Sequence, residues 1–115
     1  SEVKAQTIWM TPYPGYITYV RTFKDLQREY KKATGKDYAA TPEDNLSGSC
    51  NRIVRKGFAD QYLVYVQTRR GSPSTLAHEL GHVILQLFKH IGVKPYEGNQ
   101  EPFCYLLGHL MNLMK

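Results

Sequence analysis

The chain has 115 residues and a formal net charge of +5 at pH 7, and 42% of its residues are hydrophobic and 22% charged. This length fits one domain, 1–115, and the composition excludes a disordered or fibrous protein. No apolar run approaches the ~20 residues that span a bilayer, and no phosphate loop or helix-turn-helix signature occurs, so we expect neither a membrane nor a nucleic-acid partner.

The first two thirds of the chain predict four strands and one helix. Turns rich in proline and glycine separate the strands, which fall at 7–10, 16–20, 51–56 and 61–68. The helix at 23–33 begins after Thr22, a favourable N-cap, and ends at Gly35. The last strand is rich in Val, Leu and Tyr at successive positions, which is typical of a strand covered on both faces.

The last third of the chain predicts two helices, at 73–91 and 100–114. Ser72 is the expected N-cap of the first helix, and Gly92 ends it. Asn99 is the expected N-cap of the second. The resulting order β-β-α-β-β-α-α predicts an α+β domain, in which the helices pack against one face of a small antiparallel sheet.

The first of these helices carries the segment His78-Glu79-Leu80-Gly81-His82. Two histidines four positions apart project from one helix face and can grip one metal ion, and imidazole ligands favour Zn²⁺. Glu79 is placed to hydrogen-bond a water at the metal and to take its proton. Gly81 costs roughly 1 kcal/mol in a helix interior, which suggests that another segment comes close there. An apolar stripe packs this helix onto the core: Leu76, Leu80, Val83, Ile84, Leu87 and Ile91.

A zinc site of the peptidase type needs a third protein ligand, for which Glu101 is the preferred candidate. Glu101 follows His82 by nineteen residues and stands at the start of the helix that packs back on the first. The other candidates are His109, Glu97 and His90. His109 lies two turns further along its helix, and His90 lies in a last helical turn, where a cation is favoured without any metal.

Further residues of the predicted helix at 100–114 belong to the candidate site. Tyr105 lies one turn after Glu101 on the same helical face, and it is the first candidate to stabilise the oxyanion of peptide hydrolysis, with His109 second. Gly108 suggests a close approach between this helix and its neighbour. One of the two later strands would offer an edge on which an extended peptide can pair.

With these residues the chain resembles the gluzincins, in which a helix-borne His-Glu-x-x-His is completed by a glutamate on a following helix. The resemblance covers about 72–114, and the short chain is most similar to minigluzincins and to small metallopeptidases encoded by phages and prophages. It implies a minimal zincin-like fold, one Zn²⁺ held by His78, His82 and Glu101, and a peptide or protein substrate hydrolysed with Glu79 as general base. The longer gluzincin pattern of Asn-Glu followed by Ser-Asp is absent around Glu101.

The short chain leaves two alternatives to a peptidase, because larger members of the class build their cleft from a second subdomain. One is a zinc-stabilised binding or structural module without useful turnover, such as a phage component. The other is a nucleic-acid-associated protein that uses the positive charge. Cys50 and Cys104 form no disulfide framework, so we expect reduced thiols and a cytoplasmic protein, in the bacterial host if the chain is phage-encoded.

Overall fold

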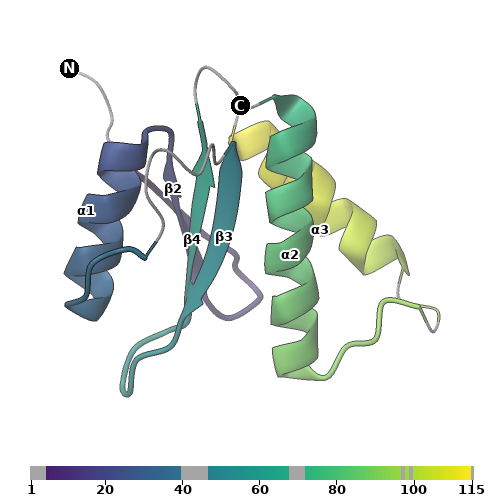
Figure 1. Ribbon diagram of the computed structural model, residues 1–115. Coiled ribbons are helices and arrows are strands. Elements are labelled where there is room, and N and C mark those ends of the chain that lie inside the picture. The colour runs from purple at the N-terminus through teal and green to yellow at the C-terminus, as the bar shows by residue number, and fades with distance from the viewer. Residues whose placement is uncertain (1–4, 40–46, 68–71, 97, 99, 115) are drawn as a thin grey trace.

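The computed structural model describes residues 5–39, 47–67, 72–96, 98 and 100–114, which form a four-stranded sheet with helices on both faces (Figure 1). Its elements in chain order are β1 (Gln6–Trp9), β2 (Tyr16–Val20), α1 (Phe23–Thr34), β3 (Gly48–Ile53), β4 (Gln61–Val66), α2 (Pro73–Ile91) and α3 (Gln100–Leu113). Their types and order agree with those predicted, and the α+β class is confirmed. β3 begins earlier than predicted, at Gly48, whereas Thr68, the predicted end of β4, lies outside the described residues.

The sheet is mixed rather than antiparallel. Its strand order is β1-β2-β4-β3, in which β1 pairs with β2 and β3 pairs with β4 in antiparallel fashion, whereas β2 and β4 are parallel. The prediction of an antiparallel sheet is therefore wrong at its central pair. Parallel neighbours need a long crossover connection, and α1 and β3 lie between β2 and β4 in the chain.

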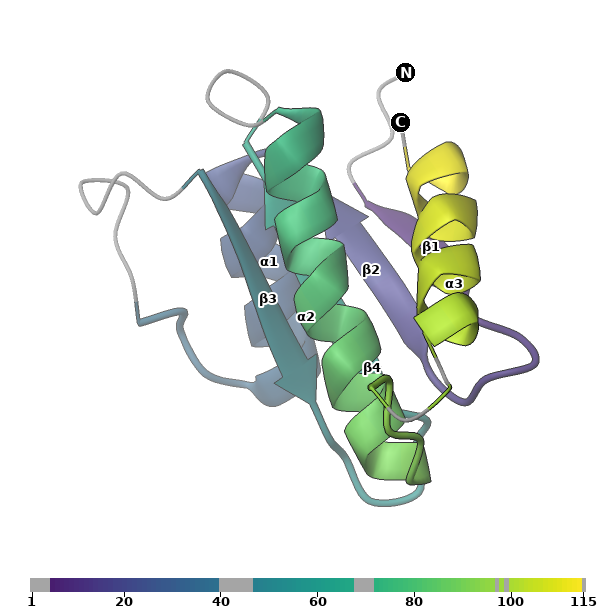
Figure 2. The ribbon, with the colours of Figure 1, turned by 90° about the vertical axis from the view of Figure 1, so that its right-hand side faces the viewer.

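The helices divide between the two faces of the sheet. α1 covers one face, whereas α2 and α3 cover the other, as both views show (Figures 1 and 2). The prediction that the helices share one face is wrong, and the reason lies in β4. All six residues of β4 are buried, so both faces of the sheet need cover. One core cluster, which includes Tyr62 and Val64, lies under α2 and α3, and a second, which includes Leu63 and Tyr65, lies under α1.

α2 is the longest helix, with 19 residues, and it begins and ends as predicted. The Oγ atom of Ser72 accepts a hydrogen bond from the backbone N–H of Thr75 at 3.2 Å, and Pro73 is the first helical residue. Gly92 follows the helix with a φ of 80°, a left-handed conformation that favours glycine. The predicted apolar stripe is buried, apart from the half-buried Ile91. None of the described helices, α2 included, is long and apolar enough to cross a membrane.

The other two helices also follow the prediction closely. The side chain of Thr22 accepts a hydrogen bond at 3.1 Å from a backbone N–H of the first turn of α1, and Gly35 ends that helix with a φ of 75°. α3 packs on α2 partly through Phe103, whose ring centroid lies 6.2 Å from that of Phe88. Asn99, the predicted N-cap of α3, lies outside the described residues.

Candidate metal centre

His78 and His82 occupy successive turns of α2 and turn their rings towards each other. Their Nε2 atoms lie 3.2 Å apart, and their ring planes are nearly perpendicular, at 81°. Both residues are exposed, so an ion from solvent can reach both nitrogens. Together with the Glu79 carboxylate they form a group whose ligand atoms all lie within 4.8 Å of one another. This group can hold a metal ion.

Glu79 differs from the two histidines because it faces β3 and is only 7% exposed. Gly48 of β3 makes room for its carboxylate, since a Cβ atom at position 48 would lie 3.0 Å from Oε2 of Glu79. The same Cβ atom would lie 2.8 Å from Cγ2 of Thr75 and 3.0 Å from the backbone oxygen of Tyr65. Any side chain at Gly48 would therefore push the carboxylate or the strand aside. The sequence did not single out Gly48, because a glycine between serines is typical of a loop.

Burial and charge act together on the titratable groups beside β3. Burial raises the pKa of the Glu79 carboxyl, and positive charge on His78 and His82 opposes that shift. Burial also raises the pKa of the Cys50 thiol to about 12, and the negative charge of Glu79 adds to this shift. Cys50 is therefore a neutral thiol near neutral pH rather than a thiolate ligand. Cys50 and Cys104 are both free, as predicted.

The candidate residues of α3 lie together, beside the segment 11–13. Glu101, Tyr105 and His109 line a hollow of about 470 Å³ between α3 and the segment 11–13, which agrees with their predicted common face. Tyr105 is 74% exposed. Among the described residues, the group that can hold a metal does not include Glu101. Glu101 as the third ligand and Tyr105 as the oxyanion partner thus stay predictions.

The remaining predictions concern two ligand candidates and two glycines. Nδ1 of His90 lies 3.3 Å from an amino nitrogen of Arg52, at the far end of α2 from the metal centre. Glu97 lies outside the described residues. Among the described residues, a Cβ atom at Gly81 or Gly108 would meet nothing within 4 Å outside the backbone of its own helix, so the predicted close approaches at these two positions are wrong.

No protein-family model, no curated protein and no solved structure matches this chain. The resemblance to gluzincins therefore stays a prediction from the motif. In the structure this motif lies on a capped helix, its glutamate is buried, and the helix packs against the edge strand β3.

Proposed function

We propose that the chain is a zinc-dependent metallopeptidase in which His78 and His82 bind the ion and Glu79 is the general base. The observation that carries this proposal is the convergence of two imidazole nitrogens beside a buried carboxylate. All three side chains come from one capped helix that is packed on the core, so their relative positions are held by the backbone of α2.

The separation of the imidazole nitrogens supports zinc as the ion. Two nitrogens bound to one tetrahedral zinc ion at about 2.0–2.1 Å lie about 3.3–3.4 Å apart. The Nε2 atoms of His78 and His82 lie 3.2 Å apart, so both can bind without rearrangement of the helix. A bound zinc ion would polarise the scissile carbonyl and lower the pKa of a water molecule. The site still requires a third protein ligand, and Glu101 is the residue that we propose for it.

Glu79 would carry the proton through the reaction. Its carboxylate lies within 4.8 Å of both imidazole nitrogens, so it can accept a proton from a water molecule next to them. The water oxygen bonds to the carbonyl carbon of the substrate, the C–N bond breaks, and Glu79 returns the proton to the leaving amine. The tight fit at Gly48 limits the positions that this carboxylate can adopt.

The outer edge of β3 supports an extended peptide as the substrate. β3 stands last in the strand order and pairs with β4 alone among the described strands. Its other edge has backbone groups with which an added strand can pair. Because Glu79 lies beside Gly48 at the start of β3, a peptide on this edge passes close to the general base.

Cleavage of a mixed peptide library by the zinc-loaded protein tests the proposal. We expect Glu79→Gln to lower turnover by at least about a hundredfold, because proton transfer is lost, while zinc content stays at the wild-type level. His82→Ala should lose both zinc and turnover. Asp37→Asn, which removes an exposed negative charge on the far side of the sheet, should change neither.

Two results would change the conclusion. Zinc uptake without cleavage of any peptide would replace the peptidase with a zinc-stabilised module, and no zinc uptake at all would contradict the metal centre itself.

The zinc affinity of Glu101→Ala tests the third ligand separately. A marked loss of affinity would support Glu101, whereas unchanged affinity would show that this prediction is wrong.

A further inference from the structure

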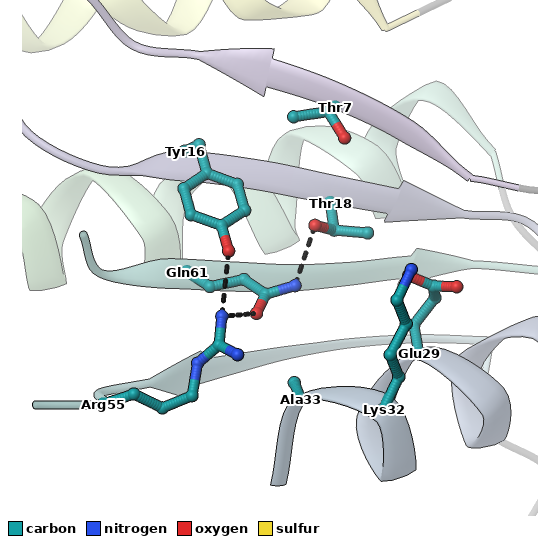
Figure 3. A pocket seen from close by; sticks show the side chains of 8 residues that line it. All are labelled: Thr7, Tyr16, Thr18, Glu29, Lys32, Ala33, Arg55 and Gln61. Carbon is teal, nitrogen blue, oxygen red and sulfur yellow. Dashed lines mark hydrogen bonds between the residues drawn. The ribbon is translucent and has the colours of Figure 1, made fainter. Parts of the chain in front are cut away.

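A polar hollow of about 200 Å³ lies between the strands and α1, on the face of the sheet opposite to the candidate metal centre (Figure 3). Its floor includes Thr18 of β2 and Gln61 of β4, which are only 4% and 5% exposed. One wall comes from α1, with Lys32 and Ala33, and another from Arg55, which follows β3. We call this cavity the α1 hollow.

The floor of the α1 hollow is polar, whereas the next positions of β2 and β4 on the same face are apolar. Val20 of β2 and Leu63 of β4 belong to the buried cluster under α1. Two positions earlier on the same face of each strand, the buried residues are polar: Thr18 and Gln61. Nε2 of Gln61 donates a hydrogen bond to Oγ1 of Thr18 at 2.9 Å. The hydroxyl hydrogen of Thr18 is therefore left to bind another acceptor.

Arg55 is held in place by one of its two amino groups. Nη2 donates hydrogen bonds to the hydroxyl of Tyr16 at 3.1 Å and to Oε1 of Gln61 at 3.3 Å. The guanidinium also lies over the ring of Phe58, 4.8 Å from its centroid. Nε is buried without a hydrogen-bond partner among the described residues. The second amino group points away from Tyr16, towards the space between Gln61 and Ala33 (Figure 3).

The α1 hollow carries more positive than negative charge. Within the described parts of the chain, neither Arg55 nor Lys32 takes part in an ion pair. Glu29, the one acidic residue among the described lining residues, lies 3.4 Å from Nε of Arg28 and is already paired. Because a part-buried cation without an ionic partner is unfavourable, an anion in the hollow would stabilise Arg55.

We propose that the α1 hollow binds a small oxyanion, a carboxylate or phosphate group, between Arg55, Lys32 and the hydroxyl of Thr18. The planar fork of a guanidinium matches both groups. A volume of 200 Å³ is about that of six or seven water molecules, which accommodates phosphate or a short carboxylic acid. The small side chain of Ala33 keeps the hollow open on the helix side. This site is independent of the proposed zinc chemistry.

NMR titration of the whole chain with inorganic phosphate and, separately, with succinate tests the proposal, with chloride keeping the ionic strength constant. We expect saturable shifts of the Thr18 and Ala33 amides and of the side-chain amide of Gln61. Arg55→Gln should weaken binding by at least about tenfold, because a charged hydrogen-bond donor is lost. Lys32→Gln should weaken it by about twofold to fivefold. The tighter of the two anions identifies the group that the site prefers.

Matched variants separate a specific site from general attraction to a basic protein. Lys56→Gln and Lys24→Gln each remove one exposed positive charge outside the hollow and should leave the affinity unchanged. Ala33→Leu fills the hollow without changing the charge and should abolish the saturable shifts, which keeps the test valid if Arg55→Gln does not fold. Absence of saturable shifts with both anions, or equal weakening in the control variants, would overturn the proposal. Glu79→Gln should bind the anions as wild type does.

Discussion

Gly48 and Gly81 both adjoin the candidate metal centre, but only Gly48 is closely surrounded. A methyl group at position 48 would lie 3.0 Å or less from three atoms, one of them a backbone oxygen. We therefore expect Gly48→Ala to lower the free energy of unfolding by about 1–3 kcal/mol, as overpacking does. Urea denaturation followed by circular dichroism measures this loss, and a variant as stable as wild type would contradict the close fit beside Glu79.

Gly81→Ala is the opposite case on the same helix. A Cβ atom there would meet no described residue within 4 Å outside the backbone of the helix, and alanine is favoured over glycine in a helix interior by about 1 kcal/mol. We expect Gly81→Ala to raise the free energy of unfolding by up to about 1 kcal/mol. Denaturation in the same urea series measures the gain. A loss of stability would mean that position 81 is more crowded than the structure describes.

The two cysteines should differ in reactivity. Burial raises the pKa of the Cys50 thiol to about 12, so its reactive thiolate is scarce near pH 8, whereas Cys104 is exposed. At about pH 8, near the ordinary pKa of a thiol, iodoacetamide should label Cys104 first and leave Cys50 intact until the protein unfolds. Mass spectrometry of the labelled peptides measures the order. Equal labelling in the folded protein would argue against the burial of Cys50.

α2 depends on its first turn, because that turn leads directly into the metal motif. Ser72→Ala removes the side-chain oxygen that accepts from the N–H of Thr75, and we expect a loss of about 1 kcal/mol in the free energy of unfolding. Ser72→Asp keeps an acceptor and adds a negative charge at a helix N-terminus, so it should retain wild-type stability. Chemical denaturation of both variants checks this pair. Equal losses in both would point to another cause than the cap.

The arrangement of the sheet could be predicted only in part from local sequence patterns. In β4, Val, Leu and Tyr follow Gln61 at successive positions, which indicated that both faces of the strand are covered, and both are. The same sequence does not state which helix covers which face or that β2 and β4 pair in parallel. These choices depend on burial gained between segments that lie far apart in the chain, and local propensity carries no information about them.

Zinc should stabilise the whole molecule if α2 binds it, because the unfolded chain does not hold the two imidazoles together. At a free zinc concentration of a hundred times Kd, the free energy of unfolding should rise by about 2.7 kcal/mol. Thermal unfolding with zinc and then with chelator measures the change. His82→Ala should lose the stabilisation by zinc. His109→Gln changes an exposed histidine outside the group of His78, Glu79 and His82, and it should keep the stabilisation. An effect that survives in His82→Ala would place the zinc elsewhere.

The metal motif, the boundaries of α2 and its buried stripe were all predictable from the amino-acid sequence, because each depends on residues within a few turns of one another. His78, Glu79 and His82 are adjacent on one helix in any fold that keeps this helix. Glu101 is a different kind of prediction, since its distance from the motif depends on how α3 packs against the rest of the molecule.

The environment of these residues depends on contacts between distant segments. Gly48 makes room for the carboxylate of Glu79, and residues as far apart in the chain as Thr7 and Gln61 meet around the α1 hollow. Neither contact can be predicted from a local sequence pattern. Both arise because both faces of β4 must be buried, which draws α1 to one side of the sheet and α2 with α3 to the other. Helix caps and helical periodicity act over a few residues, whereas the burial of a sheet requires the complete chain.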